Sequence, residues 1–153
     1  MANFIVHDAP KPAPEVRFDD ADGNPLTLSD FAGKVVLVNF WATWCGPCKV
    51  EMPGLDALQG ELGGARFEVL ALSGDRAGMK AILTFYDEIG VLHLKRYVDK
   101  TMATHRAFGT KGLPTTVLLD AEGREVGRLV GPAEWDSDDA RDLVRYYVER
   151  VDK

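Results

Sequence analysis

Cysteine is scarce in this chain: only two occur among 153 residues, so a network of structural disulfides is excluded. The sequence also lacks a run of about 18 apolar residues, which a membrane-spanning helix would need. Residues 1–14 contain no basic segment followed by an apolar core, so no signal peptide is visible. We therefore expect either a cytosolic protein or a mature or truncated form without its export segment.

Basic residues are also fewer than acidic ones. The chain has 18 Lys and Arg against 24 Asp and Glu, which gives a formal net charge of −6, and both signs are scattered. A nucleic acid or an anionic membrane surface would require a clustered basic face, so we expect neither as a partner. The length of 153 residues fits one domain, and a hydrophobic fraction of 46% is ordinary for a globular protein.

Hydrophobic periodicity predicts an α/β domain that follows a short tail. Residues 1–14 include three prolines and are expected to form an extended tail or tether remnant, so the domain would span residues 15–153. A hairpin is expected at residues 15–28. Because βα crossovers cover both faces of a sheet, we predict a central mixed β-sheet flanked by helices on both faces. The other predicted strands are residues 35–41, 67–73, 95–98, 115–120 and 125–130, and the predicted helices are 47–62, 77–89, 101–108 and one beginning near 136.

Both cysteines lie in the segment Trp44-Cys45-Gly46-Pro47-Cys48, between the predicted strand 35–41 and the predicted helix 47–62. Proline is accepted in the first turn of a helix, so Cys45 should lie at the helix N-terminus and Cys48 inside the first turn. At this spacing the two thiols can form a disulfide or separate with little backbone movement. The pair therefore indicates a reversible two-electron redox couple.

The two thiols are expected to differ in reactivity. Free amides at the helix start favour a thiolate at Cys45, which should attack a client disulfide, and Cys48 should then resolve the mixed disulfide. A zinc site is the alternative, but a second cysteine pair is absent, and His93 and His105 do not have a usual ligand spacing. We predict no metal and no cofactor other than the Cys45–Cys48 pair itself.

The cysteine motif on a strand–turn–helix resembles the thioredoxin superfamily, and Leu113-Pro114-Thr115 resembles the cis-proline loop of that superfamily. Residues 38–53 and 28–34 are similar to its TlpA/ResA branch. The resemblance implies a thioredoxin-like fold with an N-terminal β-hairpin. It also implies an inserted αβ segment, at about residues 76–108, before the cis-proline loop.

The same resemblance implies a protein thiol–disulfide oxidoreductase that reduces disulfides in particular envelope proteins. Clients such as apocytochrome c or a copper chaperone would link it to cytochrome c maturation or copper-site assembly. A membrane thiol-transfer protein would donate electrons, the location would be periplasmic, and we expect a monomer. A general cytoplasmic thioredoxin-like reductant remains an alternative. So does a thioredoxin-fold peroxidase, although its pattern requires proline and threonine where this chain has Val38 and Ala42.

Asn39 occupies the position where thioredoxin typically carries a buried acid. An amide cannot act as a base, so Glu51, three residues after Cys48, becomes the candidate proton relay. A solvated helix glutamate is the alternative for Glu51. Pro114 is expected to be cis, which would leave the backbone of Leu113 free to pair with an extended client segment. The predicted client-binding residues are Trp44, Leu113, Pro114 and Thr115, with Gly46 and Pro47 as structural support.

Overall fold

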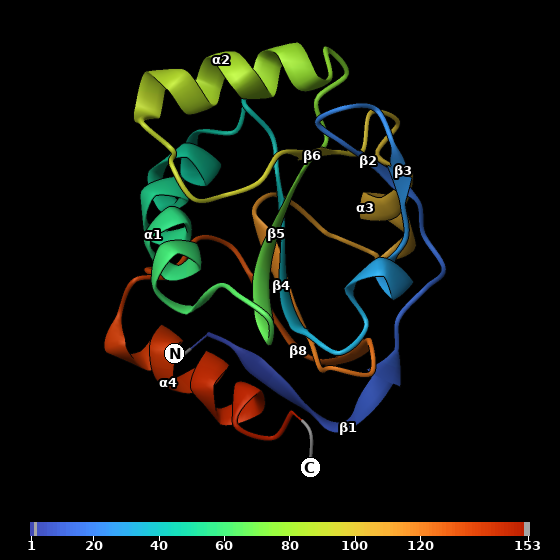
Figure 1. The fold of residues 1–153 in the computed structure, drawn as a ribbon, viewed down its shortest axis with the longest axis vertical. Coiled ribbons are helices and arrows are strands. Elements are labelled where there is room, and N and C mark those ends of the chain that lie inside the picture. The colour runs from blue at the N-terminus through green and yellow to red at the C-terminus, as the bar shows by residue number, and fades with distance from the viewer. Residues whose placement is uncertain (2, 152–153) are drawn as a thin grey trace.

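The computed structural model describes Met1 and residues 3–151. The strands of this part are β1 (Ile5–Pro12), β2 (Phe18–Asp20), β3 (Pro25–Leu26), β4 (Val35–Trp41), β5 (Phe67–Ser73), β6 (Tyr97–Val98), β7 (Thr115–Leu119) and β8 (Arg124–Val130). The helices are the 3-10 helix η1 (Leu28–Phe31), α1 (Gly46–Leu62), α2 (Met79–Ile89), α3 (Ala103–Ala107) and α4 (Asp138–Val148). All the strands join one mixed sheet in the order β1-β8-β7-β4-β5-β6-β2-β3 (Figure 1).

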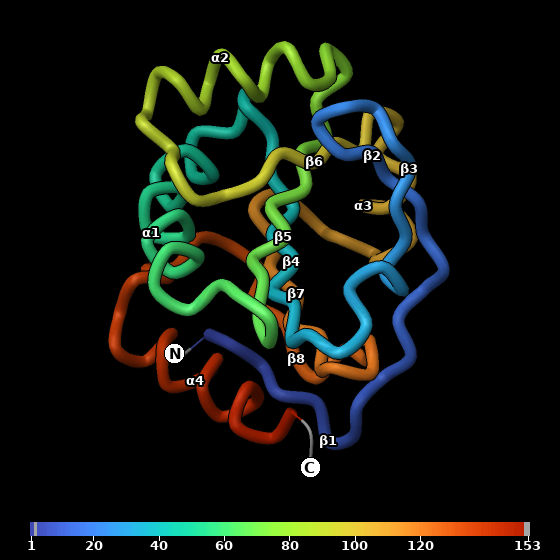
Figure 2. Tube along the Cα trace, in the orientation of Figure 1, coloured from blue at the N-terminus to red at the C-terminus, as the bar shows by residue number. Residues whose placement is uncertain are grey.

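Strand β4 is the centre of the sheet. It lies between β5, with which it pairs in parallel along its whole length, and β7, with which it pairs antiparallel (Figure 2). Every residue of β4 is buried. Leu37 and Trp41 contact the core on the side of α1, α2 and α4, while Val38 and Phe40 contact the core on the side of β2, η1 and α3. Because side chains alternate along a strand, Asn39 faces the same side as Leu37 and Trp41, toward α1.

The architecture confirms the predicted fold class. The N-terminal hairpin is present as β2 and β3, which pair antiparallel. The inserted segment contains α2, β6 and α3, and β6 extends the sheet by pairing with β5 on one side and β2 on the other. Helices therefore cover both faces of a mixed sheet, as the crossover pattern predicted.

Residues 5–12 lie within the segment that we expected to be an extended tail or tether remnant. The backbone there is extended, as the prolines predicted, but it pairs antiparallel with β8 and forms the edge strand β1. Proline lacks an N–H donor and is accepted on an edge strand, where one side of the ladder is unpaired. The alternating prolines correctly predicted extended backbone, but they could not predict that this backbone pairs with the edge of the sheet at β8.

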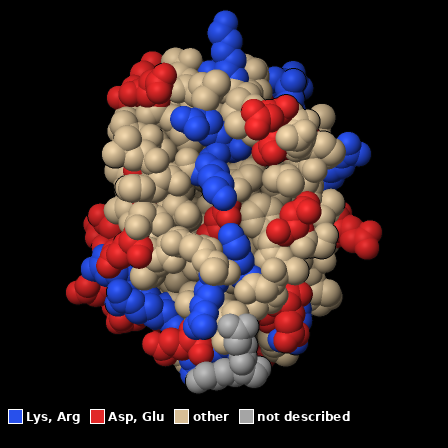
Figure 3. Space-filling view, viewed as in Figure 1, with Lys and Arg blue, Asp and Glu red and all other residues tan. Residues whose placement is uncertain are grey.

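Charged side chains of both signs share the surface. On the face drawn in Figure 3, Lys and Arg form a narrow row down the middle, with Asp and Glu on both sides of it. Among the described residues, none of the helices combines the length and the apolar character that a membrane crossing needs.

Close approach of β1 to β8 predicts the effect of one substitution. A Cβ atom added at Gly127 would lie 2.5 Å from a ring carbon of Phe4 and 2.6 Å from the carbonyl oxygen of Ile5. We expect Gly127→Ala to displace β1 and to lower the free energy of unfolding by about 1–3 kcal/mol. Urea unfolding measures the loss, and amide hydrogen exchange at Ile5 and Val6 should accelerate.

Gly64→Ala is the matched control, because a Cβ atom at Gly64 would meet nothing within 4 Å. We expect it to change stability by less than about 0.5 kcal/mol. Equal stability and equal exchange in the two variants would contradict the close packing of β1 on the sheet.

Candidate active site

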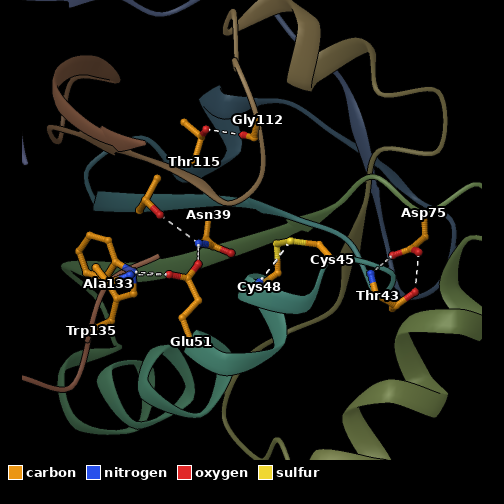
Figure 4. Close-up of a disulfide and its surroundings, with 11 residues drawn as sticks. Asn39, Thr43, Cys45, Cys48, Glu51, Asp75, Gly112, Thr115, Ala133 and Trp135 are labelled. Carbon is orange, nitrogen blue, oxygen red and sulfur yellow. Dashed lines mark hydrogen bonds between the residues drawn. A yellow bond between two sulfur atoms is a disulfide. The ribbon is translucent and has the colours of Figure 1, made fainter. Parts of the chain in front are cut away.

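The two cysteines lie where β4 gives way to α1 (Figure 4). They form a disulfide whose Cα atoms are 5.3 Å apart. Cys45 is the N-cap residue of α1, and its Sγ accepts a hydrogen bond from the backbone N–H of Cys48 at 3.3 Å. Pro47 lies in the first turn, as predicted. Sulfur at a helix N-terminus is the arrangement that favours a thiolate once the disulfide is reduced.

An open hollow of about 520 Å³ adjoins the disulfide on the Cys45 side. Cys48 is fully buried, whereas Cys45 is 6% exposed and contributes to the wall of the hollow. Trp44 is 66% exposed at the same place. We call this space the disulfide hollow; its lining is Trp44, Cys45, Pro47, Met102, Thr110, Gly112 and Leu113.

The loop before β7 brings a distant part of the chain to the disulfide hollow. The Leu113–Pro114 peptide bond is cis, and Leu113 lines the hollow. Pro114 is buried, and its carbonyl oxygen accepts a hydrogen bond from the N–H of Gly131 at 2.8 Å. Thr115, which we expected to contact the client, is fully buried, and its hydroxyl donates to the carbonyl oxygen of Gly112 at 2.7 Å. Its side chain therefore fixes the loop from within and is not at the surface of the hollow.

Glu51 lies on α1 and is buried, with 4% of the residue exposed. Oε1 accepts a hydrogen bond from Nδ2 of Asn39 at 2.6 Å, and Oε2 accepts from the N–H of Ala133 and from Nε1 of Trp135, both at 3.1 Å (Figure 4). Burial raises the pKa of Glu51 from an ordinary 4.5 to about 7, because the loss of hydration destabilises the charged form more than the three hydrogen bonds stabilise it. A carboxyl group with this pKa can take up or release a proton near neutral pH.

Asn39 connects Glu51 to the neighbouring strand. Its Nδ2 also donates to the hydroxyl of Thr116 on β7 at 3.0 Å. Its Oδ1 is buried and has no hydrogen-bond partner in the described part of the chain. In Figure 4 the Asn39 side chain is seen between the Glu51 carboxylate and the sulfur atoms. A buried acceptor without a donor is costly, so Oδ1 is available to a thiol or carboxyl proton.

Asp75 anchors the loop that precedes Cys45. It is 4% exposed, and its carboxylate accepts hydrogen bonds from the N–H and the hydroxyl of Thr43 at 2.9 and 2.6 Å. Sequence reasoning did not identify this contact, nor that of Trp135 with Glu51. Both contacts join residues far apart in the chain, and no local spacing signals them.

The two histidines of the alternative zinc site, His93 and His105, have separate surroundings. His105 is buried, and its Nδ1 lies 2.9 Å from Oδ2 of Asp99, whereas His93 packs against Gly60. Across the described residues, no group of three or more His, Cys, Asp or Glu side chains is placed to hold a metal ion.

Burial of Glu51 predicts a pH dependence of stability. With a pKa of about 7 in the folded chain and an ordinary value of 4.5, the folded form holds a proton that the unfolded form has lost between these pH values. The free energy of unfolding of the oxidised protein should therefore fall as pH rises from about 4.5 to 7, by up to about 1.4 kcal/mol per pH unit. Urea unfolding across this range measures the slope.

Glu51→Gln should remove this component of the slope, whereas the exposed-site control Glu88→Gln should retain it. Parallel stability curves for wild type and Glu51→Gln would contradict the raised pKa.

Comparisons with known proteins agree with this geometry. The sequence profile of the Redoxin family matches residues 8–144. Thiol-disulfide oxidoreductase ResA of Bacillus thuringiensis (strain Al Hakam) is 34% identical over 121 residues, which cover 79% of this chain and 69% of that protein. ResA of Bacillus subtilis (strain 168) is 32% identical over 119 residues, which cover 78% and 65%.

A solved structure extends the similarity to the fold. A thiol:disulfide interchange protein of the thioredoxin family from Chlorobium tepidum TLS has a TM-score of 0.74 at 28% identity, and the match covers 93% of this chain and 99% of that one. The fold is therefore thioredoxin-like, with a redox-active cysteine pair at the start of α1. The chain belongs to the Redoxin family and is a ResA-like thiol-disulfide oxidoreductase.

Proposed function

We propose that this oxidoreductase reduces disulfides in particular protein clients of the bacterial envelope, in cytochrome c maturation or copper-site assembly. The observation that carries the proposal is the Cys45–Cys48 disulfide at the N-terminus of α1, beside an open hollow with the Leu113 loop in its wall. Similarity to proteins named ResA supports the same reaction class. An apocytochrome c or a copper chaperone would be the client.

The first step would be attack by Cys45 in the reduced protein. Its thiolate displaces one sulfur of the client disulfide, so a Cys45–client S–S bond forms, the client S–S bond breaks, and the released client thiolate takes up a proton. Two features favour Cys45 over Cys48 in this role. The N-terminal amides of α1 stabilise a thiolate at the cap position, and Cys45 alone of the pair lines the hollow.

The second step would be resolution by Cys48. The Cys48 thiol transfers its proton to the Glu51 carboxylate and attacks Sγ of Cys45. The Cys45–Cys48 bond forms, the Cys45–client S–S bond breaks, and the second client sulfur leaves as a thiolate that takes up a proton. The client gains two electrons and two protons, and the protein dithiol becomes a disulfide. The raised pKa of Glu51 and the unpartnered Oδ1 of Asn39 support a proton path on this side of α1.

Regeneration needs a dithiol donor, for which we propose a membrane thiol-transfer protein. The Gly46-Pro47 pair between the cysteines resembles that of thioredoxin, which favours a reducing role. We further propose that the protein is periplasmic and acts as a monomer. Client docking is assigned to Trp44 and the Leu113 backbone, which line the disulfide hollow. Pro114, whose carbonyl oxygen is hydrogen-bonded to the N–H of Gly131, and the buried Thr115 hold the loop in place and do not meet the client directly.

Trapping the mixed disulfide tests the order of the two steps. Reduced Cys48→Ser should accumulate a covalent adduct with a disulfide-bonded Cys-x-x-Cys-His peptide, because serine cannot resolve the bond. Cys45→Ser should form no adduct and should lose insulin reduction. Mass spectrometry under non-reducing conditions identifies the adduct.

The opposite pattern, in which Cys45→Ser forms the adduct, would contradict the assigned roles. Insulin and peptide reduction that survive in both single variants would contradict the function itself.

A further inference from the structure

A second hollow, of about 430 Å³, lies beyond the loop that borders the disulfide hollow. Strand β8 contributes Glu125 and Arg128, and β1 contributes His7 and Lys11. The opposite wall is the segment from the end of α3 to Lys111. The pairing of β1 with β8 shifts register between Val6 and Lys11, so regular pairing is interrupted beside this space. We call it the basic hollow.

Hydrogen bonds orient the Arg128 side chain in the basic hollow. Its Nε and Nη2 both donate to the Glu125 carboxylate at 2.8 Å, and Nη2 also donates to the carbonyl oxygen of Phe108 at 2.9 Å. Its Nη1 makes no hydrogen bond within the described residues, and the side chain is 25% exposed. The guanidinium is therefore already oriented, with one donor group free for a ligand.

The negative charge of Glu125 is directed at Arg128 and His7. Burial opposes its ionisation, but hydrogen bonds from Arg128 and His7 outweigh burial and hold the pKa of the carboxyl below its ordinary value. One of its oxygens accepts from Arg128 alone, and the other lies 2.8 Å from Nε of Arg128 and 2.6 Å from Nε2 of His7. Both carboxylate oxygens are thus engaged by the residues that surround them.

Two further cations border the basic hollow without a partner. Lys11 on β1 and Lys111 on the opposite wall are exposed, and neither has a carboxylate within ion-pair distance in the part of the chain that the structure describes. Arg128 and Glu125 compensate each other, so the two lysines leave an excess of positive charge. This excess is local, since the whole chain carries a net charge of −6.

The two hollows share one wall. Along residues 109–113, Thr110, Gly112 and Leu113 line the disulfide hollow, whereas Gly109 and Lys111 line the basic hollow. An extended client segment that pairs with the Leu113 backbone would therefore lie close to both hollows.

We propose that the basic hollow binds an acidic side chain of the protein client while the client cysteine engages Cys45. The ligand is a carboxylate on the client polypeptide, held by Lys11, Lys111 and the free Nη1 of Arg128. The inference rests on the proposed function, because it names the chemical class of client that the same site prefers. Charge complementarity of this kind acts mainly on encounter rate and on partner choice.

Two synthetic peptides test the proposal. Each carries one Cys-x-x-Cys disulfide, flanked on both sides by three Glu in one peptide and by three Gln in the other. The reduced full chain is mixed with each peptide, and reduction is followed by acid quench, thiol alkylation and mass spectrometry. Because the net charge of the chain is −6, long-range electrostatics alone would slow the Glu peptide. We expect the Glu peptide to react about tenfold faster at low salt, with the preference falling in about 0.5 M salt.

The variant Lys11→Gln/Lys111→Gln should reduce both peptides at nearly equal rates. The charge-matched control Lys80→Gln/Lys100→Gln changes two exposed lysines outside the hollow and should keep the full preference. Both lysines of the hollow are exposed, so the double variant should fold normally, and its Cys45–Cys48 potential should be unchanged.

Three outcomes would overturn the proposal. If the wild type reduces both peptides at equal rates, the acidic-client inference fails and the proposed function stands. If the wild type reduces neither peptide, the proposed function fails as well. If the wild type shows no peptide preference but binds phosphatidylglycerol vesicles, and the Lys11→Gln/Lys111→Gln variant does not, the basic hollow serves a lipid headgroup instead.

Discussion

The buried Glu51 carboxylate joins α1 to two other segments of the chain, the central strand β4 and the segment between β8 and α4. Asn39 on β4, the backbone of Ala133 and the indole of Trp135 all donate to it. These contacts hold α1 against the central strand and against the segment between β8 and α4. Since α1 carries Cys48 one turn before Glu51, the position of the disulfide depends on this set of hydrogen bonds.

The same arrangement explains how a buried carboxyl group is accommodated here and why it can exchange a proton near neutral pH. Three N–H donors favour the charged form of Glu51, but burial opposes it more strongly, so the pKa rises to about 7. The group can then exist with or without its proton near neutral pH. Asn39 adds a buried oxygen that lacks a donor, so the region beside the sulfurs contains both a proton acceptor and an unused hydrogen-bond acceptor.

Much of the fold could be predicted from the local sequence pattern, because residues close together in the chain determine the strands, the helices and the motif at their junction. The apolar run before Cys45 and the proline after it predicted a buried strand followed by a helix start. Contacts between residues that are distant in sequence could not be predicted from local pattern. Trp135 meets Glu51, and Asp75 meets Thr43, only because the sheet brings their segments together. The prolines of residues 1–14 indicated extended backbone but not the edge of β8 that receives it.

The potential of the Cys45–Cys48 couple as a function of pH tests the central claim most directly. Equilibration with a glutathione redox buffer between about pH 5 and 9 measures it for wild type and for Glu51→Gln. The account predicts a potential below that of glutathione. Because the proposed proton transfer from Cys48 links the protonation of Glu51 to the redox state of the pair, it also predicts a change of slope near pH 7 in the wild type that Glu51→Gln lacks. A potential well above that of glutathione, or the same slope in both proteins across this range, would contradict it.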